Sequence, residues 1–199
     1  MKDITRTDIL NALIRKYRLT SYLEIGVQNK DNNFNKILCP VKYGVDPDVN
    51  AKADFIGTSD DFFYQNKRTF DLIFIDGLHH YEQVKRDFEN ALICLRDDGY
   101  ILIHDSLPEN EIGTRVPRET LVWWGDVYKF IFQLWAYQNI NFKIFNTDQG
   151  CCLIWKEIMA PRKADNMFYN GKRWDKINFT WQFYLDNKHL LKITDEFII

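Results

Sequence analysis

The stretch Phe70–Tyr81, FDLIFIDGLHHY, decides how the rest of the chain is interpreted. Its first six residues are apolar except for one acid, and they are followed by Asp76, Gly77, Leu78 and two histidines. Such an apolar run is typical of a strand buried on both faces in a parallel sheet. In open sheets of this kind, ligands bind outside the carboxyl ends of the strands. The stretch therefore predicts a buried strand whose end presents polar side chains to a crevice.

The length and composition fit one globular domain with a sizeable core. The 199 residues are 46% hydrophobic and 16% aromatic, with a formal net charge of −2. Sequence-independent binding to nucleic acid needs an excess of basic charge, so no nucleic-acid partner is expected. No apolar run approaches the roughly 20 residues of a membrane span, and residues 1–16 lack a secretory apolar core. We therefore expect no membrane association.

The four cysteines, Cys39, Cys94, Cys151 and Cys152, form no C-x-x-C pair. Cys151 and Cys152 are neighbours in a predicted strand, so their side chains point to opposite faces. This pattern favours reduced thiols in a cytoplasmic protein over a disulfide framework or a zinc site.

Predicted strands alternate with predicted helices along most of the chain. The pattern predicts helices at 9–17, 32–38, 58–64, 81–95 and 118–138, strands at 21–26, 42–46, 53–57, 70–75 and 100–103, and a closing hairpin at 141–145 and 150–155. This order predicts an α/β fold with a Rossmann-like, mostly parallel sheet, helices on both faces and a C-terminal antiparallel hairpin. We expect residues 1–159 to form the main domain, and the aromatic-rich residues 160–199 to pack on it as an extension.

The first two strand ends carry candidate cofactor-binding residues. Gly26 follows the first strand, where a glycine allows a ligand to approach the backbone closely. Asp46 ends the second strand, and a carboxylate there can accept both hydroxyls of a ribose. The alternative is a tight turn at Gly26 and a helix-capping Asp46 before Pro47.

The third strand ends in Gly57-Thr58-Ser59-Asp60 at the same edge of the predicted sheet. Small polar residues there suit contact with an adenine amino group. The alternative role is that of a helix N-cap, which does not exclude the first.

The fourth and fifth strands end in Asp76 and in His104-Asp105. A buried carboxylate is costly unless it has a donor or a cation. Two carboxylates with an imidazole suit a divalent cation such as Mg²⁺ or Mn²⁺. The alternative is a hydrogen-bonded network that only fixes the loops.

His79 and His80 lie where the opening strand turns into its helix. A neutral imidazole is a suitable general base for a hydroxyl group. We expect one of the two histidines to face the crevice. Further along, Arg115 and Arg118 are candidates for contact with an anionic substrate.

Five segments, taken together and in this order, resemble the class I S-adenosylmethionine-dependent methyltransferases. The segments are Tyr22–Val27, Tyr43–Pro47, Thr58–Phe63, Phe74–Tyr81 and Ile101–Asp105. Within that family, the chain is most similar to a small bacterial group with a D-G-x-H-x-Y signature. The resemblance covers roughly residues 20 to 156 and implies a seven-stranded sheet whose last strand is antiparallel.

The resemblance also implies roles for the candidate residues. Glu24, Gly26 and Asp46 would bind S-adenosylmethionine, with Asp46 on the ribose. Ser59 and Asp60 would lie near the adenine.

Related O-methyltransferases hold a divalent metal with an Asp at the position of Asp76 and an acidic pair at that of His104-Asp105. We accordingly predict Asp76, His104 and Asp105 as metal ligands, and we count Asp76 among both the catalytic and the cofactor-binding residues. The chain departs from the family pattern in its histidine at 104 and in the single glycine of Gly26–Lys30.

The activity implied is O-methylation of a small-molecule acceptor by in-line displacement, with His79 or His80 taking the acceptor proton. The group's association with polysaccharide modification makes a glycosyl hydroxyl the first choice, by analogy alone. Two alternatives are a non-catalytic module that binds S-adenosylmethionine and an NAD-dependent oxidoreductase. The oxidoreductase predicts G-x-G-x-x-G at the first turn, where only Gly26 is present. The oligomeric state is left open.

Overall fold

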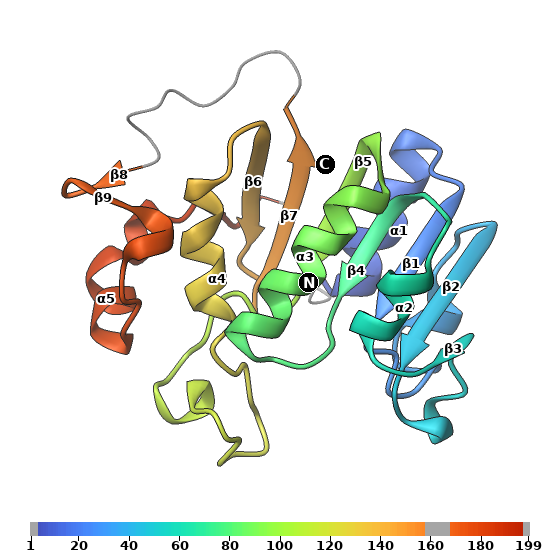
Figure 1. Cartoon of the computed structure of the whole chain (residues 1–199), viewed down its shortest axis with the longest axis horizontal. Coiled ribbons are helices and arrows are strands. Elements are labelled where there is room, and N and C mark those ends of the chain that lie inside the picture. Colours follow the sequence, from blue (N-terminus) through green and yellow to red (C-terminus); the bar gives the residue numbers. More distant parts are fainter. Residues whose placement is uncertain (1–3, 158–167, 197–199) are drawn as a thin grey trace.

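The computed structural model describes residues 4–157 and 168–196, which form one central sheet flanked by helices (Figure 1). The sheet has the strand order β10-β6-β7-β5-β4-β1-β2-β3. Its strands are β1 Ser21–Ile25, β2 Val41–Asp46, β3 Phe55–Ile56, β4 Phe70–Ile75, β5 Leu95–Ile103, β6 Ile140–Phe145, β7 Cys151–Lys156 and β10 Ile193–Thr194. The five neighbouring strands β5, β4, β1, β2 and β3 pair in parallel. Strand β7 is antiparallel to both β5 and β6.

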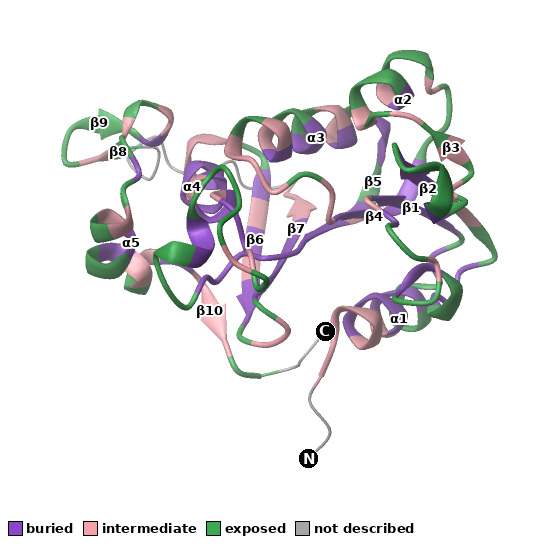
Figure 2. Cartoon of the chain, turned by 90° about the horizontal axis from the view of Figure 1, so that it is seen from below, coloured by how far each residue is buried: buried purple, intermediate pink, exposed green. Residues whose placement is uncertain are grey.

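Helices cover both faces of the sheet, as Figure 2 shows. The α-helices are α1 Arg6–Tyr17, α2 Ser59–Gln65, α3 Tyr81–Cys94, α4 Val127–Gln133 and α5 Trp181–Asn187. Short 3₁₀ turns are η1 Phe34–Lys36, η2 Val49–Ala51, η3 Ile112–Thr114, η4 Leu134–Ala136, η6 Trp174–Lys176 and η7 Lys188–Leu190.

Strand β4 is buried along its whole length because both of its faces are covered. Leu72 and Phe74 pack in the apolar cluster that includes α1, and Ile73 and Ile75 pack in the cluster that includes α3 and α4. Alternate side chains of a strand point to opposite faces, so a strand between two helical layers must be apolar throughout. The apolar run FDLIFI therefore indicates a strand at the centre of the sheet, covered on both faces.

The predicted mostly parallel sheet, the helices on both faces and the antiparallel hairpin are confirmed. The predicted hairpin at 141–155 is the β6–β7 pair, and a smaller antiparallel hairpin follows in β8 Phe168–Tyr169 and β9 Lys172–Arg173. The predicted number of seven strands is wrong, because the sheet has eight. The additional strand, β10, comes from the C-terminal extension and pairs in parallel with the edge strand β6.

The predicted helix over 118–138 is wrong in its first half. The chain turns back at Gly125, whose φ of +58° lies in the left-handed region, and helix α4 begins only at Val127. The backbone N–H groups of Trp124 and Gly125 both donate to the carbonyl of Gly113, at 3.0 and 3.2 Å, which fixes the loop instead of a helix. The predicted helix at 32–38 is likewise only the single turn η1.

The C-terminal extension packs on α4. Trp174 and Phe179 are buried and lie nearly parallel to Phe132 of α4, with ring centroids 6.2 and 5.7 Å away. The predicted boundary between residues 159 and 160 lies outside the described residues. In the part of the chain that the structure describes, no helix is long and apolar enough to cross a membrane.

Candidate functional site

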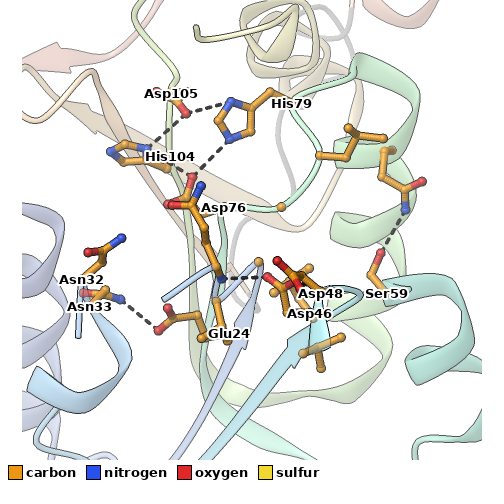
Figure 3. Close-up of a pocket in the computed structure, with 18 of the residues that line it drawn as sticks. Glu24, Asn32, Asn33, Asp46, Asp48, Ser59, Asp76, His79, His104 and Asp105 are labelled. Atoms are coloured by element: carbon orange, nitrogen blue, oxygen red, sulfur yellow. Dashed lines mark hydrogen bonds and ion pairs between the residues drawn. The ribbon is translucent and has the colours of Figure 1, made fainter. Parts of the chain in front are cut away.

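A cavity of about 690 Å³ lies at the carboxyl ends of the parallel strands. Figure 3 shows polar side chains from the ends of β1, β2, β4 and β5 converging on it. The volume is in the range of ordinary small-molecule sites. The cavity therefore lies at the edge of the sheet where the sequence predicts a ligand.

Glu24 forms one wall of the cavity and is only 1% exposed. Its Oε2 atom accepts hydrogen bonds from the Tyr22 hydroxyl at 2.5 Å and from Asn33 Nδ2 at 2.9 Å. Burial raises the pKa of Glu24 to about 7 despite these two donors. Among the described residues, no cationic side chain lies within 4 Å of this carboxylate. A buried acid without a cationic partner in a cavity wall fits a ligand that carries a positive charge.

Gly26 is required by the protein itself. Its φ is +87°, and a Cβ atom added there would lie 2.1 Å from the carbonyl oxygen of Asp76. The loops after β1 and β4 therefore touch at a point where no side chain fits. The sequence predicts a glycine here for the close approach of a ligand, and the structure adds an intramolecular reason.

Asp46 ties together the two loops that border the cavity. Its Oδ2 accepts from the backbone N–H of Gln28 at 2.7 Å, and its Oδ1 accepts from that of Asp48 at 2.8 Å. The side chain still lines the cavity. Each carboxylate oxygen has a second lone pair, so Asp46 retains capacity to accept from a diol.

The residues after β3 divide between the cavity and the surface. Ser59 lines the cavity, and its hydroxyl accepts from Gln83 Nε2 at 3.0 Å. Asp60 is exposed, pairs with Arg86 at 3.5 Å and is not part of the cavity wall. The structure thus brings Glu24, Gly26, Asp46 and Ser59 together and leaves Asp60 outside.

Two acids and two histidines meet at the ends of β4 and β5 (Figure 3). Asp76 Oδ1 lies 3.4 Å from His79 Nε2 and 3.3 Å from His104 Nδ1. Asp105 Oδ2 lies 3.2 Å from His79 Nδ1 and 3.2 Å from His104 Nδ1. Burial opposes the charges, but the neighbouring imidazoles hold the pKa of Asp76 below its usual range, and Asp76 and Asp105 raise that of His79.

Two buried atoms of this cluster, His104 Nδ1 and Asp105 Oδ1, make no hydrogen bond within the described residues. Asp76, His79 and Asp105 each offer a ligand atom, and these atoms lie within 4.8 Å of one another. The donor set of two carboxylates and an imidazole suits a divalent cation. The predicted ligand His104 also faces both acids, but its other nitrogen faces an arginine.

That arginine is Arg6, and neither Arg6 nor its partner Asp148 is predicted from the sequence as a site residue. Arg6 lies in the first turn of α1 and lines the cavity. Its backbone N–H donates to Asp148 Oδ2 at 2.7 Å, and its Nη1 lies 3.3 Å from Asp148 Oδ1 and 2.9 Å from His104 Nε2. A guanidinium only donates, so a hydrogen bond between these two groups requires His104 Nε2 to accept.

A second group with metal-ligand spacing, His104, Asp148 and Cys151, is occupied by this guanidinium. Burial raises the pKa of the Cys151 thiol, and the guanidinium already contacts the other two members of the group. We therefore do not assign a metal to this group.

The two adjacent histidines have different surroundings. His79 lines the cavity, its Nδ1 lies 3.1 Å from the carbonyl oxygen of Trp123, and its ring stacks on the indole at a centroid distance of 5.2 Å. His80 is not part of the cavity wall and meets the Trp123 ring edge-on. Arg118 lines the cavity, whereas Arg115 pairs with Glu119 at the surface. The cavity wall therefore includes His79 but not His80, and Arg118 but not Arg115.

Residues 23–106 match a family model described as a methyltransferase domain. This matched segment runs from β1 to the end of β5 and holds most of the cavity wall. The chain has the class I methyltransferase fold. No curated protein matches the chain in sequence.

Solved structures with the same methyltransferase fold are distant in sequence. A candidate O-methyltransferase from Klebsiella pneumoniae is 17% identical with a TM-score of 0.58, covering 78% of this chain and 82% of its own. A Podospora anserina methyltransferase bound to SAH is 15% identical with a TM-score of 0.57, covering 76% and 77%. An O-methyltransferase from Bacillus cereus in complex with SAH is 14% identical with a TM-score of 0.55, covering 77% and 82%.

Proposed function

We propose that this protein is an S-adenosylmethionine-dependent O-methyltransferase acting on a hydroxyl group of a sugar or another small molecule. The observation that carries the proposal is the division of the cavity into two chemically distinct halves. Glu24, Gly26, Asp46 and Ser59 line the cavity from the ends of β1 and β2 and the start of α2, which we call one half. Asp76, His79 and Asp105 line it from the ends of β4 and β5, which we call the other half. The first half suits a zwitterionic nucleoside, and the second suits a hydroxyl that must lose a proton.

The cofactor half fits S-adenosylmethionine in the chemistry of its residues. Glu24 would accept from the ammonium group, Asp46 from the ribose hydroxyls, and Ser59 would lie at the adenine. The bound cofactor supplies a methyl group on a positively charged sulfur, ready for displacement. The contribution of the protein is to hold the acceptor oxygen in line with that methyl group and to exclude water.

In the acceptor half, His79 would take the proton of the attacking hydroxyl. It lies in the cavity wall, and Trp123 fixes its ring by stacking and through its carbonyl oxygen. Asp76 and Asp105 on either side stabilise the imidazolium that forms. A divalent cation, Mg²⁺ or Mn²⁺, would be held by Asp76, Asp105 and the predicted ligand His104, which leaves His79 to take the proton. The cation would lower the pKa of the acceptor hydroxyl.

The first test is the choice of cofactor. Titration calorimetry of the purified protein with S-adenosylhomocysteine and with NAD should give heat only with S-adenosylhomocysteine. Tight binding of NAD alone would instead favour the oxidoreductase alternative. A screen for methyl transfer to hydroxylated sugars, with radiolabelled cofactor, then separates an enzyme from a module that only binds.

Replacing Asp46 by alanine tests the cofactor half. We expect the Kd for S-adenosylhomocysteine to rise by about 10- to 100-fold, because the ribose loses a charged hydrogen-bond acceptor. The matched control is Asp60→Ala, which removes an acid outside the cavity and should change the Kd by less than about twofold. Equal affinities for Asp46→Ala and the unchanged protein would remove Asp46 from the cofactor site.

Metal removal tests the acid cluster separately. Mn²⁺ titrated into the metal-stripped protein should lose its free-ion electron paramagnetic resonance signal as it binds, and Asp105→Asn should weaken that binding by at least about tenfold. Methyl transfer should fall in EDTA and return with Mg²⁺. If Mn²⁺ stays free in the unchanged protein, the metal is not part of the site.

A further inference from the structure

We propose that Arg6, in the first turn of α1, binds the carboxylate at the amino-acid end of the cofactor, opposite Glu24, which binds its ammonium group. The inference rests on the proposed function, because it assigns a residue to the cofactor half of the same cavity. Arg6 lies outside residues 23–106, the segment that matches the methyltransferase domain model.

The first argument is the placement of charge around the cavity. Among the described residues, the acids that line it are Glu24, Asp46, Asp48, Asp76 and Asp105, and the arginines are Arg6 and Arg118. Arg118 belongs to the loop beside Trp123, on the acceptor half, and is exposed. Arg6 contacts Asp148, His104 and Asp76, and its positive charge also acts on Glu24, whose pKa it lowers. An amino acid presents one negative and one positive group on neighbouring atoms, which such a pair matches.

The second argument is the free donor capacity of Arg6. Its backbone N–H and Nη1 are held by Asp148, and Nη1 also lies 2.9 Å from His104. Its Nε lies 3.9 Å from Asp76, too far for a hydrogen bond. In the part of the chain that the structure describes, the two N–H groups of Nη2 donate to no acceptor. The guanidinium is thus fixed on one side and able to donate on the other, and its side chain is 25% exposed.

The third argument is that hydrogen bonds hold the first turn of α1 close to both Glu24 and Asp148. The hydroxyl of Thr7, next to Arg6, donates to Asn33 Oδ1 at 2.7 Å, and Asn33 Nδ2 donates to Glu24 at 2.9 Å. The hydroxyl of Thr147, next to Asp148, donates to the carbonyl of Ile4. These contacts fix the distance between Arg6 and Glu24, as recognition of a short zwitterion requires.

The experiment changes the protein and the ligand together. Titration calorimetry measures the Kd of S-adenosylhomocysteine, of its decarboxylated analogue and of 5′-methylthioadenosine, which lacks the whole amino acid. For Arg6→Met we expect the Kd of S-adenosylhomocysteine to rise by about 10- to 100-fold, and the Kd of the two other ligands to change by less than about twofold. Glu24→Gln should weaken both S-adenosylhomocysteine and its decarboxylated analogue, since each keeps the ammonium group.

Two further variants keep the test decisive. Arg15→Met removes an exposed arginine from the same helix and should leave all three affinities unchanged. Arg6→Gln retains a hydrogen-bonding side chain toward Asp148 and should show the same selective loss if Arg6→Met does not fold.

Equal weakening of all three ligands, or an unchanged Kd for S-adenosylhomocysteine, would overturn the role of Arg6. If the unchanged protein binds none of the three, the proposed function fails together with this inference. If it binds S-adenosylhomocysteine no better than the decarboxylated analogue, only the inference fails, and Arg6 is then free to meet an anionic acceptor.

Discussion

Replacing His79 by alanine is expected to lower the rate of methyl transfer by about 10²- to 10⁴-fold, the range that a positioned general base contributes. The physical reason is that the attacking hydroxyl must lose its proton as the new bond forms. His79 lines the cavity and lies 3.4 Å from Asp76 and 3.2 Å from Asp105. His104 also contacts both acids, but it is buried and its other nitrogen faces Arg6. The measurement is single-turnover transfer from radiolabelled cofactor to the acceptor that the screen identifies.

The neighbouring residue provides the control for this prediction. His80→Ala removes an imidazole one position away that packs against Trp123 outside the cavity, so its rate should stay within about threefold of the unchanged protein. Both variants should bind S-adenosylhomocysteine with unchanged affinity, because neither histidine is placed at the cofactor half. A His79→Ala variant with full activity, or a His80→Ala variant with the larger loss, would contradict the assignment.

The ends of the parallel strands are the part of the site that the sequence predicts well. Asp46, Asp76 and Asp105 follow apolar runs, and parallel strands present their carboxyl ends at one edge. Their placement at one edge of the sheet therefore follows from the pattern of parallel strands, whereas the order of the strands in the sheet, β5-β4-β1-β2-β3, differs from the chain order. The direction of each side chain does not follow from it, since neighbouring residues after a strand point to different sides. This is why Asp60 and His80 lie outside the cavity while Ser59 and His79 line it.

Arg6 and Asp148 were not predictable by the same rule, because neither residue ends a parallel strand. Arg6 belongs to the first turn of α1, and Asp148 to the turn of the β6–β7 hairpin. One signal was available: β7 is antiparallel to β5, so the turn that precedes β7 must lie at the edge where β5 ends. The predicted hairpin thus already placed Thr147-Asp148-Gln149 near the site.

The errors in the fold arise where tertiary contacts override local pattern. Strand β10 is two residues long and is defined only by its pairing with β6. The aromatic segment before α4 has helical spacing, but Gly125 adopts a positive φ and its N–H bonds to Gly113. The resulting loop places Trp123 against His79. The segment that departs from its helical preference therefore lies beside the site, where it supplies the contact between Trp123 and His79.

The second large effect concerns Asp87, a buried acid of α3 that is only 1% exposed and is not part of the cavity wall. Its Oδ1 accepts from Gln83 Nε2 at 3.0 Å, and its Oδ2 makes no hydrogen bond within the described residues. Burial raises its pKa from 3.8 to about 6. Asp87→Asn removes the titration and keeps the shape, so we expect the variant to be more stable than the unchanged protein near neutral pH.

The sign follows from comparing the folded and unfolded states. Below pH 3.8 the carboxyl is protonated in both states and contributes nothing to the pH dependence. Between pH 3.8 and about 6 it ionises in the unfolded state first, so the free energy of unfolding falls as the pH rises. Above that window both states are ionised, and the loss remains constant at about 3 kcal/mol, from ~1.4 kcal/mol for each unit of pKa difference.

Urea unfolding of the unchanged protein and of Asp87→Asn, at intervals from pH 4 to pH 8, measures this contribution as a difference between two curves. The other buried groups, including Glu24, titrate in both proteins and cancel. We expect the advantage of the variant to grow from near zero at pH 4 to about 2–3 kcal/mol at pH 7.5, which raises the Tm by roughly 4–12 °C for a chain of this length. A difference that does not change with pH would show that Asp87 ionises normally in the folded protein. Glu24→Gln should show the same trend in stability, since burial raises the pKa of Glu24 to about 7, but that variant alone should lose affinity for S-adenosylhomocysteine.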